Sequence, residues 1–185
     1  MTLEEFLRWD DGTDTRYELI NGFPMAMAPP ARAHGILCAR LAGLIDAALH
    51  SRRPCAAQIE AGIARPDHND SFYIADIAVS CRPYRQGEQL VEDPILIVEI
   101  LSPSTERNDR RLKLPAYQEL GSVREIVLID ADSHHAEVYR REGARWGIEL
   151  ARGAEATLSL ATVELHMSMA ELYNGIATQA VTDER

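Results

Sequence analysis

The sequence has few cysteines, and their pattern excludes two kinds of cross-linked fold. Cys38, Cys55 and Cys81 are odd in number and form no Cys-x-x-Cys spacing. This pattern supports neither a disulfide framework nor a zinc knuckle. We expect reduced thiols in a cytoplasmic protein, because that compartment keeps cysteines reduced.

Long apolar runs are also missing, and we expect no export signal. No stretch approaches the roughly 20 apolar residues of a membrane-spanning helix. The first residues, Met1 to Trp9, contain two glutamates where a signal peptide carries basic residues. We therefore expect a soluble, cytoplasmic protein without a membrane partner.

The chain lacks an excess of basic residues. It has 19 lysines and arginines against 29 aspartates and glutamates, which gives a net charge of -10. This charge opposes nonspecific attraction to a polyanion and argues against a protein that coats DNA. It does not exclude an enzyme with a local basic patch, and carboxylates that bind divalent cations contribute to the same total.

The residues that are present are typical of a globular protein. Of the 185 residues, 46% are apolar and 26% are charged. A chain of this length can bury a core without staples. Because no repeat or linker interrupts it, we expect one domain over residues 1–185.

Hydrophobic periodicity and turn signals predict the order of the elements. Asn21-Gly22 between two apolar arms predicts an N-terminal β-hairpin. The helical spacing of apolar residues predicts a long helix at 31–50. Strands at 55–64, 72–80 and 94–101, a basic helix at 108–120 and a strand at 124–130 follow. A hairpin at 137–139 and 146–150, a strand at 158–165 and a helix from Ser168 complete the prediction.

This order of elements predicts the fold class. A helix, three strands, a helix and a strand (αβββαβ) indicate an α/β (α+β) fold with a mixed β-sheet flanked by helices. The N-terminal hairpin and the extra C-terminal strands extend this core.

Two carboxylates interrupt strands that are otherwise apolar. Glu99 lies in the run from Ile95 to Leu101, and Asp76 lies in the predicted strand at 72–80. An ionised carboxylate inside a sheet is costly unless it is paired, hydrogen-bonded or bound to a metal. These two acids are therefore the first candidates for a functional site.

A hard divalent cation between the two strands would explain both acids. Mg²⁺, or Mn²⁺ in its place, takes oxygen ligands and keeps several waters, so Asp76, Glu99 and the main-chain carbonyl of Ile100 would suffice. The cation would lower the pKa of a bound water and offset charge on a phosphoryl transition state. Lys113 is a candidate to orient or deprotonate that water, or to stabilise the developing charge.

Five short segments of the chain can be compared with known families. They are Tyr17–Gly22, Ala28–Pro30 with His34, Ala75–Ile77, Val98–Thr105, and Asp109 with Lys113 and Tyr117. In this order they resemble the Uma2 family of predicted endonucleases, which is similar to the PD-(D/E)xK nuclease superfamily. The match covers about residues 17–146 and implies a restriction endonuclease-like core.

The resemblance implies a role for each matching residue. Asp76 would be the motif aspartate, Glu99 the second acid and Glu18 an additional acid from the hairpin. His34 would contact the substrate.

The chain departs from the superfamily pattern at two positions. Ala75 precedes Asp76 where that pattern has proline, and Leu101 stands where it has a lysine. The Uma2-like pattern therefore gives the lysine role to Lys113 on the following helix.

Arg107 lies at the start of the same predicted helix, and Arg110 and Arg111 lie within it. They are candidates to bind substrate phosphates, although such arginines more often form a solvated helix face.

Structural roles compete with the catalytic ones. Glu99 and Lys113 can form a buried ion pair without catalysis. Asp109 lies four residues before Lys113 and can take the same lysine in a helical pair. Glu18, taken alone, is typical of a surface position.

Together these residues predict a metal-dependent endonuclease that hydrolyses phosphodiester bonds of nucleic acid, with DNA as the expected substrate and Mg²⁺ or Mn²⁺ as the cofactor. We expect a homodimer, because cutting two strands takes two sites. One alternative is a catalytically silent binding module on the nuclease fold, acting as a homodimer. Another is a metal-dependent hydrolase of a small phosphorylated molecule, which would show no salt-dependent DNA binding.

Overall fold

A mixed eight-stranded β-sheet organises the structure, a computed structural model that describes residues 1–65, 67–103 and 105–179. Ser104 of the Uma2-like segment and the last residues of the predicted domain, 180–185, lie outside this description. The strands follow the order β2-β1-β4-β5-β6-β7-β8, and β3 pairs with β4. They are β1 (Tyr17–Ile20), β2 (Phe23–Ala26), β3 (Ala56–Ala64), β4 (Phe72–Ser80), β5 (Pro94–Leu101), β6 (Glu125–Asp130), β7 (His135–Glu142) and β8 (Arg145–Arg152).

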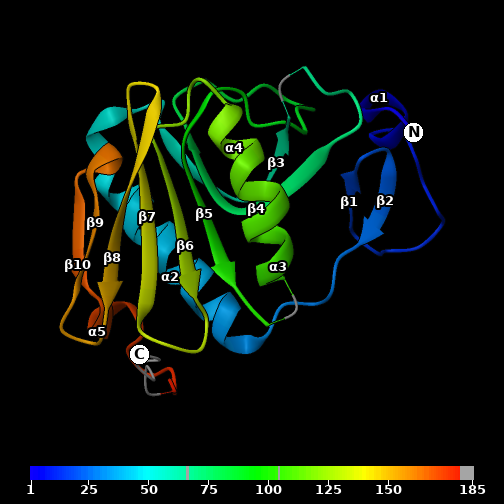
Figure 1. Ribbon diagram of the computed structural model, residues 1–185. Coiled ribbons are helices and arrows are strands. Elements are labelled where there is room, and N and C mark those ends of the chain that lie inside the picture. Colours follow the sequence, from blue (N-terminus) through cyan, green and yellow to red (C-terminus); the bar gives the residue numbers. More distant parts are fainter. Residues whose placement is uncertain (66, 104, 180–185) are drawn as a thin grey trace.

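Other elements cover both faces of the sheet (Figure 1). Helix α2 (Arg32–Ala48) packs on one face with the hairpin of β9 (Thr157–Leu160) and β10 (Leu165–Ser168). The other face carries α3 (Glu106–Asn108) and α4 (Leu114–Glu119). None of the helices in the described ranges is both long and apolar enough to cross a membrane. The short helices are α1 (Leu3–Phe6), η1 (His50–Arg52), η3 (Ala161–Val163) and α5 (Met169–Leu172).

The predicted order of the core is confirmed. Helix α2 is followed by the antiparallel strands β3, β4 and β5, then by the helical segment and by β6. β6 pairs with β5 in parallel. A parallel pair needs a crossover connection of about a dozen residues or more, which the helical segment supplies. The polypeptide therefore passes over the sheet between Leu101 and Glu125.

The crossover helix widens in the middle. A π-helical turn, η2 (Asp109–Lys113), lies between α3 and α4. Pro115 follows in the first turn of α4, where it has no N–H to donate and its ring would clash with a regular preceding turn. The wider turn accommodates this proline, and such turns are frequent at functional sites.

The predicted N-terminal hairpin is confirmed. Asn21 and Gly22 both have left-handed backbones, with φ of 49° and 80°. Two left-handed residues are what a tight hairpin turn needs to match the twist of its strands. Ile20 therefore pairs directly with Phe23.

The sheet is interrupted beside β4. One edge of β4 pairs with β3 along its length, so β1 and β5 share the other edge. β1 meets β4 at Leu19 and Phe72, and β5 pairs with β4 from Ile77 onward. Residues 74–76 have no strand beside them on this edge. Their polar backbone groups have to find other partners.

The C-terminal part differs from the prediction in one place. The predicted strand at 158–165 is a hairpin, because Glu164 adopts a left-handed φ of 55° after η3 and returns the chain to pair with β9. The last helix begins as predicted. Ser168 caps it in a reciprocal capping box with Glu171.

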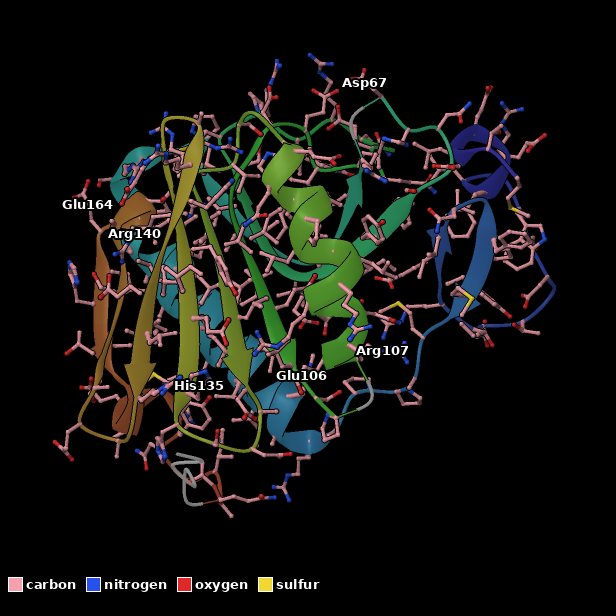
Figure 2. The ribbon with its side chains drawn as sticks, in the orientation of Figure 1. Asp67, Glu106, Arg107, His135, Arg140 and Glu164 are labelled. Atoms are coloured by element: carbon pink, nitrogen blue, oxygen red, sulfur yellow. A yellow bond between two sulfur atoms is a disulfide. The ribbon has the colours of Figure 1, made fainter. Side chains whose placement is uncertain are left out.

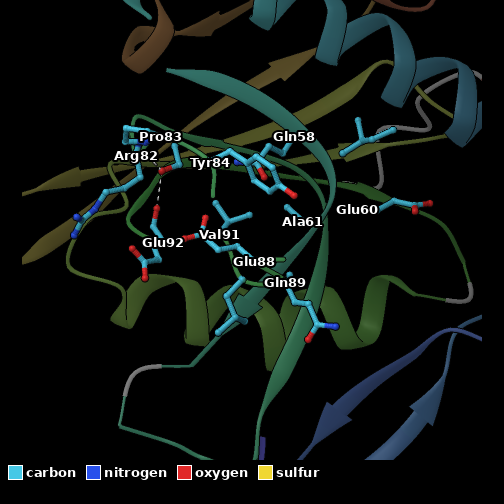
Figure 3. Close-up of a pocket in the computed structure, with 14 residues that line it drawn as sticks. Gln58, Glu60, Ala61, Arg82, Pro83, Tyr84, Glu88, Gln89, Val91 and Glu92 are labelled. Carbon is cyan, nitrogen blue, oxygen red and sulfur yellow. Dashed lines mark hydrogen bonds between the residues drawn. The ribbon is translucent and has the colours of Figure 1, made fainter. Parts of the chain in front are cut away.

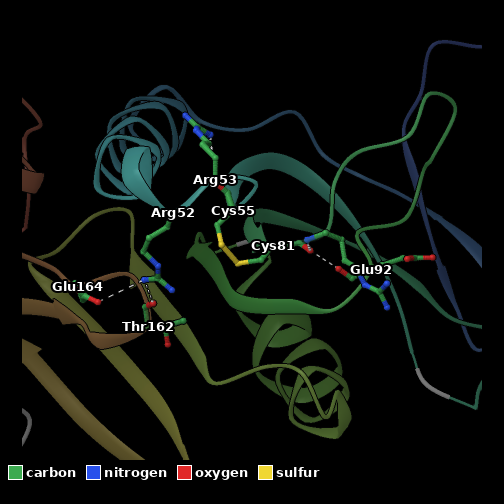
Figure 4. The surroundings of a disulfide bond; sticks show 9 residues. Arg52, Arg53, Cys55, Cys81, Glu92, Thr162 and Glu164 are labelled. Atoms are coloured by element: carbon green, nitrogen blue, oxygen red, sulfur yellow. Dashed lines mark hydrogen bonds and ion pairs between the residues drawn. A yellow bond between two sulfur atoms is a disulfide. The ribbon is translucent and has the colours of Figure 1, made fainter.

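The expectation of three reduced thiols is wrong for two of them. Cys55 and Cys81 form a disulfide, shown in Figure 4. Ala56 pairs with Ser80, so the next residue outward on each strand faces its counterpart. The strand register creates this pair, and a count of cysteines cannot reveal it. Cys38 is free, and the cysteines no longer support the expected cytoplasmic location.

Gly62 makes room for the loop around residues 82–92, which encloses a small pocket against β3 (Figure 3). A Cβ at position 62 would lie 2.3 Å from the main-chain oxygen of Gln89 and 2.8 Å from the ring of Phe72. We expect Gly62→Ala to lower the free energy of unfolding by about 1–3 kcal/mol, because the loop must move. Urea denaturation measures the change.

Gly43→Ala is the matched control. Gly43 lies in α2, and a Cβ there would meet nothing within 4 Å. Alanine is expected to raise the free energy of unfolding by up to about 1 kcal/mol, because glycine disfavours helix. Equal stability of wild type and Gly62→Ala would contradict the close packing of the loop on β3.

Candidate active site

Side chains replace a strand along the gap beside β4. The amide of Ile74 donates a hydrogen bond to Glu18 at 2.9 Å, and its carbonyl accepts one from Lys113 at 2.9 Å. The amide of Asp76 donates to Glu99 at 3.3 Å. The gap thus brings together the four residues predicted to be catalytic.

Asp76 links three elements of the fold. Its Oδ2 accepts a hydrogen bond from the Ile100 amide of β5 at 2.6 Å, and its Oδ1 lies 3.1 Å from Nε2 of His34 on α2. The hydrogen bond to Asp76 raises the pKa of His34, and the main-chain carbonyl of Ile100 acts in the same direction. His34 therefore faces the two acceptors, the Asp76 carboxylate and the Ile100 carbonyl, that we expected to bind a cation.

Glu99 points toward α4 and is only 2% exposed. Its Oε1 accepts a hydrogen bond from the Tyr117 hydroxyl at 2.6 Å and lies 3.3 Å from Nζ of Lys113. Burial raises the pKa of Glu99 well above its ordinary value. Asp76 and Asp109 add to this rise, and Lys113 opposes it. Burial therefore disfavours the charged form of Glu99 more than Lys113 favours it.

Lys113 lies among three carboxylates. Its Nζ is 2.9 Å from Glu18, 3.3 Å from Glu99 and 3.3 Å from Asp109. Burial lowers the pKa of Lys113, but the three carboxylates outweigh burial and the pKa is raised. The buried Glu99 pair and the helical Asp109 pair therefore exist together. Lys113 stays protonated at neutral pH, so it can neutralise charge and donate hydrogen bonds but cannot deprotonate a water.

The cluster contains more acids than bases. Glu18, Asp76, Glu99 and Asp109 face one lysine and one histidine. Burial raises the pKa of Asp109 as well. A divalent cation would balance this excess of carboxylates.

The cluster opens onto a pocket of about 270 Å³. Asp76, Glu99, Asp109 and Lys113 line this pocket together with residues 27–31, which join β2 to α2. Asp76, with 20% of its side chain exposed, is the most accessible of these acids, whereas Glu99 and Asp109 are each 2% exposed. The other polar lining residues are Arg16, His34, Glu60, Ser102 and Thr105.

The structure separates the three predicted phosphate-binding arginines. Arg110 forms a two-pronged ion pair with Glu137 at 2.8 and 2.9 Å and also contacts Glu106 at 2.8 Å. Arg107 and Arg111 are exposed and form no ion pair with the described residues. Figure 2 shows Arg107 on the side of α3 toward the chain between β2 and α2, away from Glu106. Arg110 is therefore engaged by Glu137 and Glu106, which leaves Arg107 and Arg111 as the exposed arginines of the three.

Sequence reasoning missed Glu60. It lies opposite Asp76 in the β3–β4 ladder, between the pairs that Ile59 and Ala61 form, and has a left-handed φ of 52°. It lines the pocket and pairs with Arg16. Two features would have identified Glu60. It is a charged residue in an apolar strand, and it lies opposite Asp76 once β3 and β4 are aligned.

The oxygen donors fit Mg²⁺ or Mn²⁺ if water completes the shell. In the parts of the chain that the structure describes, no group of three or more His, Cys, Asp or Glu side chains is arranged to hold a metal. Mg²⁺ is usually bound by one or two carboxylates and several waters. Asp76 and Glu99 supply two carboxylates, and the Ile100 carbonyl, which faces His34, is the expected third oxygen.

Comparison with known proteins identifies the family. The model of the Uma2 family, described as "Putative restriction endonuclease", matches residues 3–170. The uncharacterized protein slr1290 of Synechocystis sp. is 25% identical over 184 residues, which cover 94% of this chain and 92% of that protein. The uncharacterized protein sll1609 of the same organism is 23% identical over 171 residues, covering 89% of this chain and 95% of that protein.

A crystal structure shows the same fold. It is that of a nuclease from Anabaena variabilis, described as "putative" and as belonging to DUF820. The TM-score is 0.76 at 22% identity, and the match covers 94% of this chain and 97% of that one. The fold is thus a nuclease fold with a restriction endonuclease-like core, as predicted. Since the family model spans well over half of the sequence, this chain belongs to the Uma2 family.

Proposed function

We propose that this protein is a Mg²⁺- or Mn²⁺-dependent endonuclease that hydrolyses phosphodiester bonds of DNA. Membership of the Uma2 family supports nuclease activity in general. The observation that carries the proposal is the pair of carboxylates, Asp76 and Glu99, held at the split between β4 and β5 and open to a pocket.

Each residue of the cluster has a role in this proposal. Asp76, Glu99 and the Ile100 carbonyl would hold the cation, which when bound supplies an acidified water and positive charge for the phosphoryl group. Lys113 would contribute its positive charge near the phosphoryl group, and its contacts keep Glu18 and Glu99 in place. It is not the general base, because its three carboxylates keep it protonated.

The substrate contacts are proposed from exposure and position. Arg107 and Arg111 are exposed cations on the crossover helix and are proposed to contact phosphates. His34 lines the pocket and donates to Asp76, so it is proposed to meet the substrate there. The homodimer stays a prediction.

A catalytically silent binding module is the second candidate. One observation favours it: Lys113 and His34 already contact the carboxylates proposed to bind the cation. In a silent protein these contacts would be the permanent partners of Asp76 and Glu99, and no cation would be needed.

Calorimetric titration with Mn²⁺ separates the two candidates. We expect wild type to bind Mn²⁺ and Asp76→Asn to lose most of this binding, because one of the two carboxylate ligands becomes a neutral amide. His34→Gln is the informative companion, since it removes a contact of Asp76 but leaves both carboxylates. If Mn²⁺ binding is absent from wild type, or unchanged in Asp76→Asn, the metal-dependent proposal is wrong.

A further inference from the structure

Strand β2 presents an apolar ridge to solvent. Phe23 is 71% exposed and Met25 is 49% exposed. Met27 continues the hairpin ladder, because its amide donates to the carbonyl of Arg16 at 2.9 Å. Alternate residues of a strand share a face. We call Phe23, Met25 and Met27 the β2 ridge.

The β2 ridge leads into the candidate active site. Met25 pairs with Glu18 across the hairpin, and paired residues of antiparallel strands point to the same face. Glu18 in turn contacts Lys113 at 2.9 Å, and Met27 lines the pocket. With a rise of about 3.3 Å per residue, the ridge extends roughly 13 Å from Met27 to Phe23. A DNA strand that leaves the pocket along β2 would therefore pass over the exposed side chains of Phe23 and Met25.

The segment that joins β2 to α2 gives the pocket an apolar wall. Met27, Ala28, Pro29 and Pro30 line it beside the acids. Phosphates are bound by cations and hydrogen-bond donors, so apolar side chains do not contribute to binding a phosphodiester backbone. In a duplex the base faces are stacked inside. An unpaired base exposes a flat apolar face that fits both the wall and the β2 ridge.

The charge of the protein points in the same direction. A net charge of -10 gives a polyanion no general attraction. Arg16 and Lys113 line the pocket but are already paired with carboxylates, and Arg107 projects toward the chain between β2 and α2 (Figure 2). Contacts to bases must therefore contribute a large share of the affinity.

We propose that the β2 ridge and the wall that continues it bind unpaired bases, so that the substrate of this site is DNA that is single-stranded or locally unpaired where it is cut. The inference rests on the proposed function for the reaction and adds the substrate class. Phe23 supplies the stacking surface, and Met25 and Met27 supply adaptable apolar contacts.

Binding of DNA in EDTA tests the inference without cleavage. A fluorescent single-stranded oligonucleotide and the duplex made from it are titrated with wild type and Phe23→Ala, and anisotropy is measured. We expect wild type to prefer the single strand. Phe23→Ala should weaken single-strand binding by about 5- to 100-fold, the loss of one stacked base, and leave duplex binding unchanged. Phe23→Trp should retain the single-strand affinity.

Tyr84→Ala is the matched control, because Tyr84 is an aromatic residue of similar exposure, 73%, and lines a different pocket. It should bind DNA as wild type does. Equal losses for single strand and duplex, or no loss in Phe23→Ala, would overturn the inference. A lower mass for Phe23→Ala than for wild type in sedimentation would also overturn the inference. It would mean that a second copy of the chain covers the β2 ridge in wild type.

The same series keeps the inference separate from the nuclease proposal. If wild type cuts DNA but Phe23→Ala binds normally, the inference is wrong and the nuclease proposal stands. If Phe23-dependent binding is found in a protein that cuts nothing with Mg²⁺ or Mn²⁺, the nuclease proposal is wrong and the base-binding ridge stands.

Discussion

Asp76→Asn is expected to leave a folded protein that no longer cleaves DNA with Mg²⁺ or Mn²⁺. The amide oxygen can still accept the hydrogen bond of the Ile100 amide, and the amide nitrogen can face His34. The fold therefore loses little. The carboxylate charge is lost, and with several kcal/mol of cation stabilisation at stake, the rate should fall on the order of 10³-fold or more. The cleavage rate of Glu99→Gln should fall by a similar factor. Plasmid nicking under single-turnover conditions measures both.

Asp46→Asn provides the control for this result. Asp46 is a surface carboxylate paired with Arg53 at 2.9 Å, so the same chemical change occurs away from the pocket. We expect unchanged cleavage and a small change in stability, since exposed ion pairs contribute about 0–1 kcal/mol. Wild-type rates in both Asp76→Asn and Glu99→Gln would rule out the roles we assign to these acids.

Lys113→Met is expected to cause the largest loss of stability. The lysine is 6% exposed and is the cation that Glu18, Glu99 and Asp109 share. Removing one partner of a buried ion pair leaves unbalanced charge and typically costs about 3–5 kcal/mol. Thermal or urea unfolding without metal should show this loss near neutral pH.

The stability that Lys113→Met loses should depend on pH in a defined direction. Burial raises the pKa of Glu99 and of Asp109 above their ordinary values of 4.5 and 3.8. A carboxyl whose pKa is higher in the folded than in the unfolded state stabilises the fold below its unfolded pKa, and this contribution disappears as pH rises through the folded pKa. The deficit of Lys113→Met should therefore be smaller at about pH 5 than at about pH 8. Lys113 lowers the pKa of both carboxyls, so its removal raises these pKa values further, and protonation at low pH then removes more of the unbalanced charge.

Arg111→Met is the companion of Lys113→Met. Arg111 lies two residues away on the same π-helical turn but is exposed. Its removal should change the free energy of unfolding by no more than about 0.5 kcal/mol. If Lys113→Met is as stable as Arg111→Met at neutral pH, Lys113 does not hold the acids together.

Much of the fold followed from local patterns. The runs at 72–80 and 94–101 are apolar and bounded by turn residues, so their ends could be placed to the residue. Asn21-Gly22 specified a hairpin because few other dipeptides tolerate two left-handed residues. Glu99 could be recognised because a carboxylate in a buried strand needs an explanation.

The features that could not be predicted from the sequence depend on how the strands are aligned with one another. The Cys55–Cys81 bond and the place of Glu60 opposite Asp76 exist only once β3 is aligned with β4. The partner of Arg110 could not be foreseen either, because Glu137 comes from a strand 27 residues later. The sharing of one β4 edge by β1 and β5 creates the gap that holds the acids, and no local pattern encodes it.

The attachment of the hairpin has a consequence for the motions of the site. β1 is joined to β4 through one registered pair, Leu19 and Phe72, whereas β5 is held on both of its edges. Local unfolding of the hairpin therefore requires less free energy than global unfolding. Such an opening carries Glu18 away from Lys113 while Asp76 and Glu99 remain on the sheet. Asp76 and Glu99 thus belong to the stable part of the sheet, whereas Glu18 belongs to a hairpin that opens to solvent more readily.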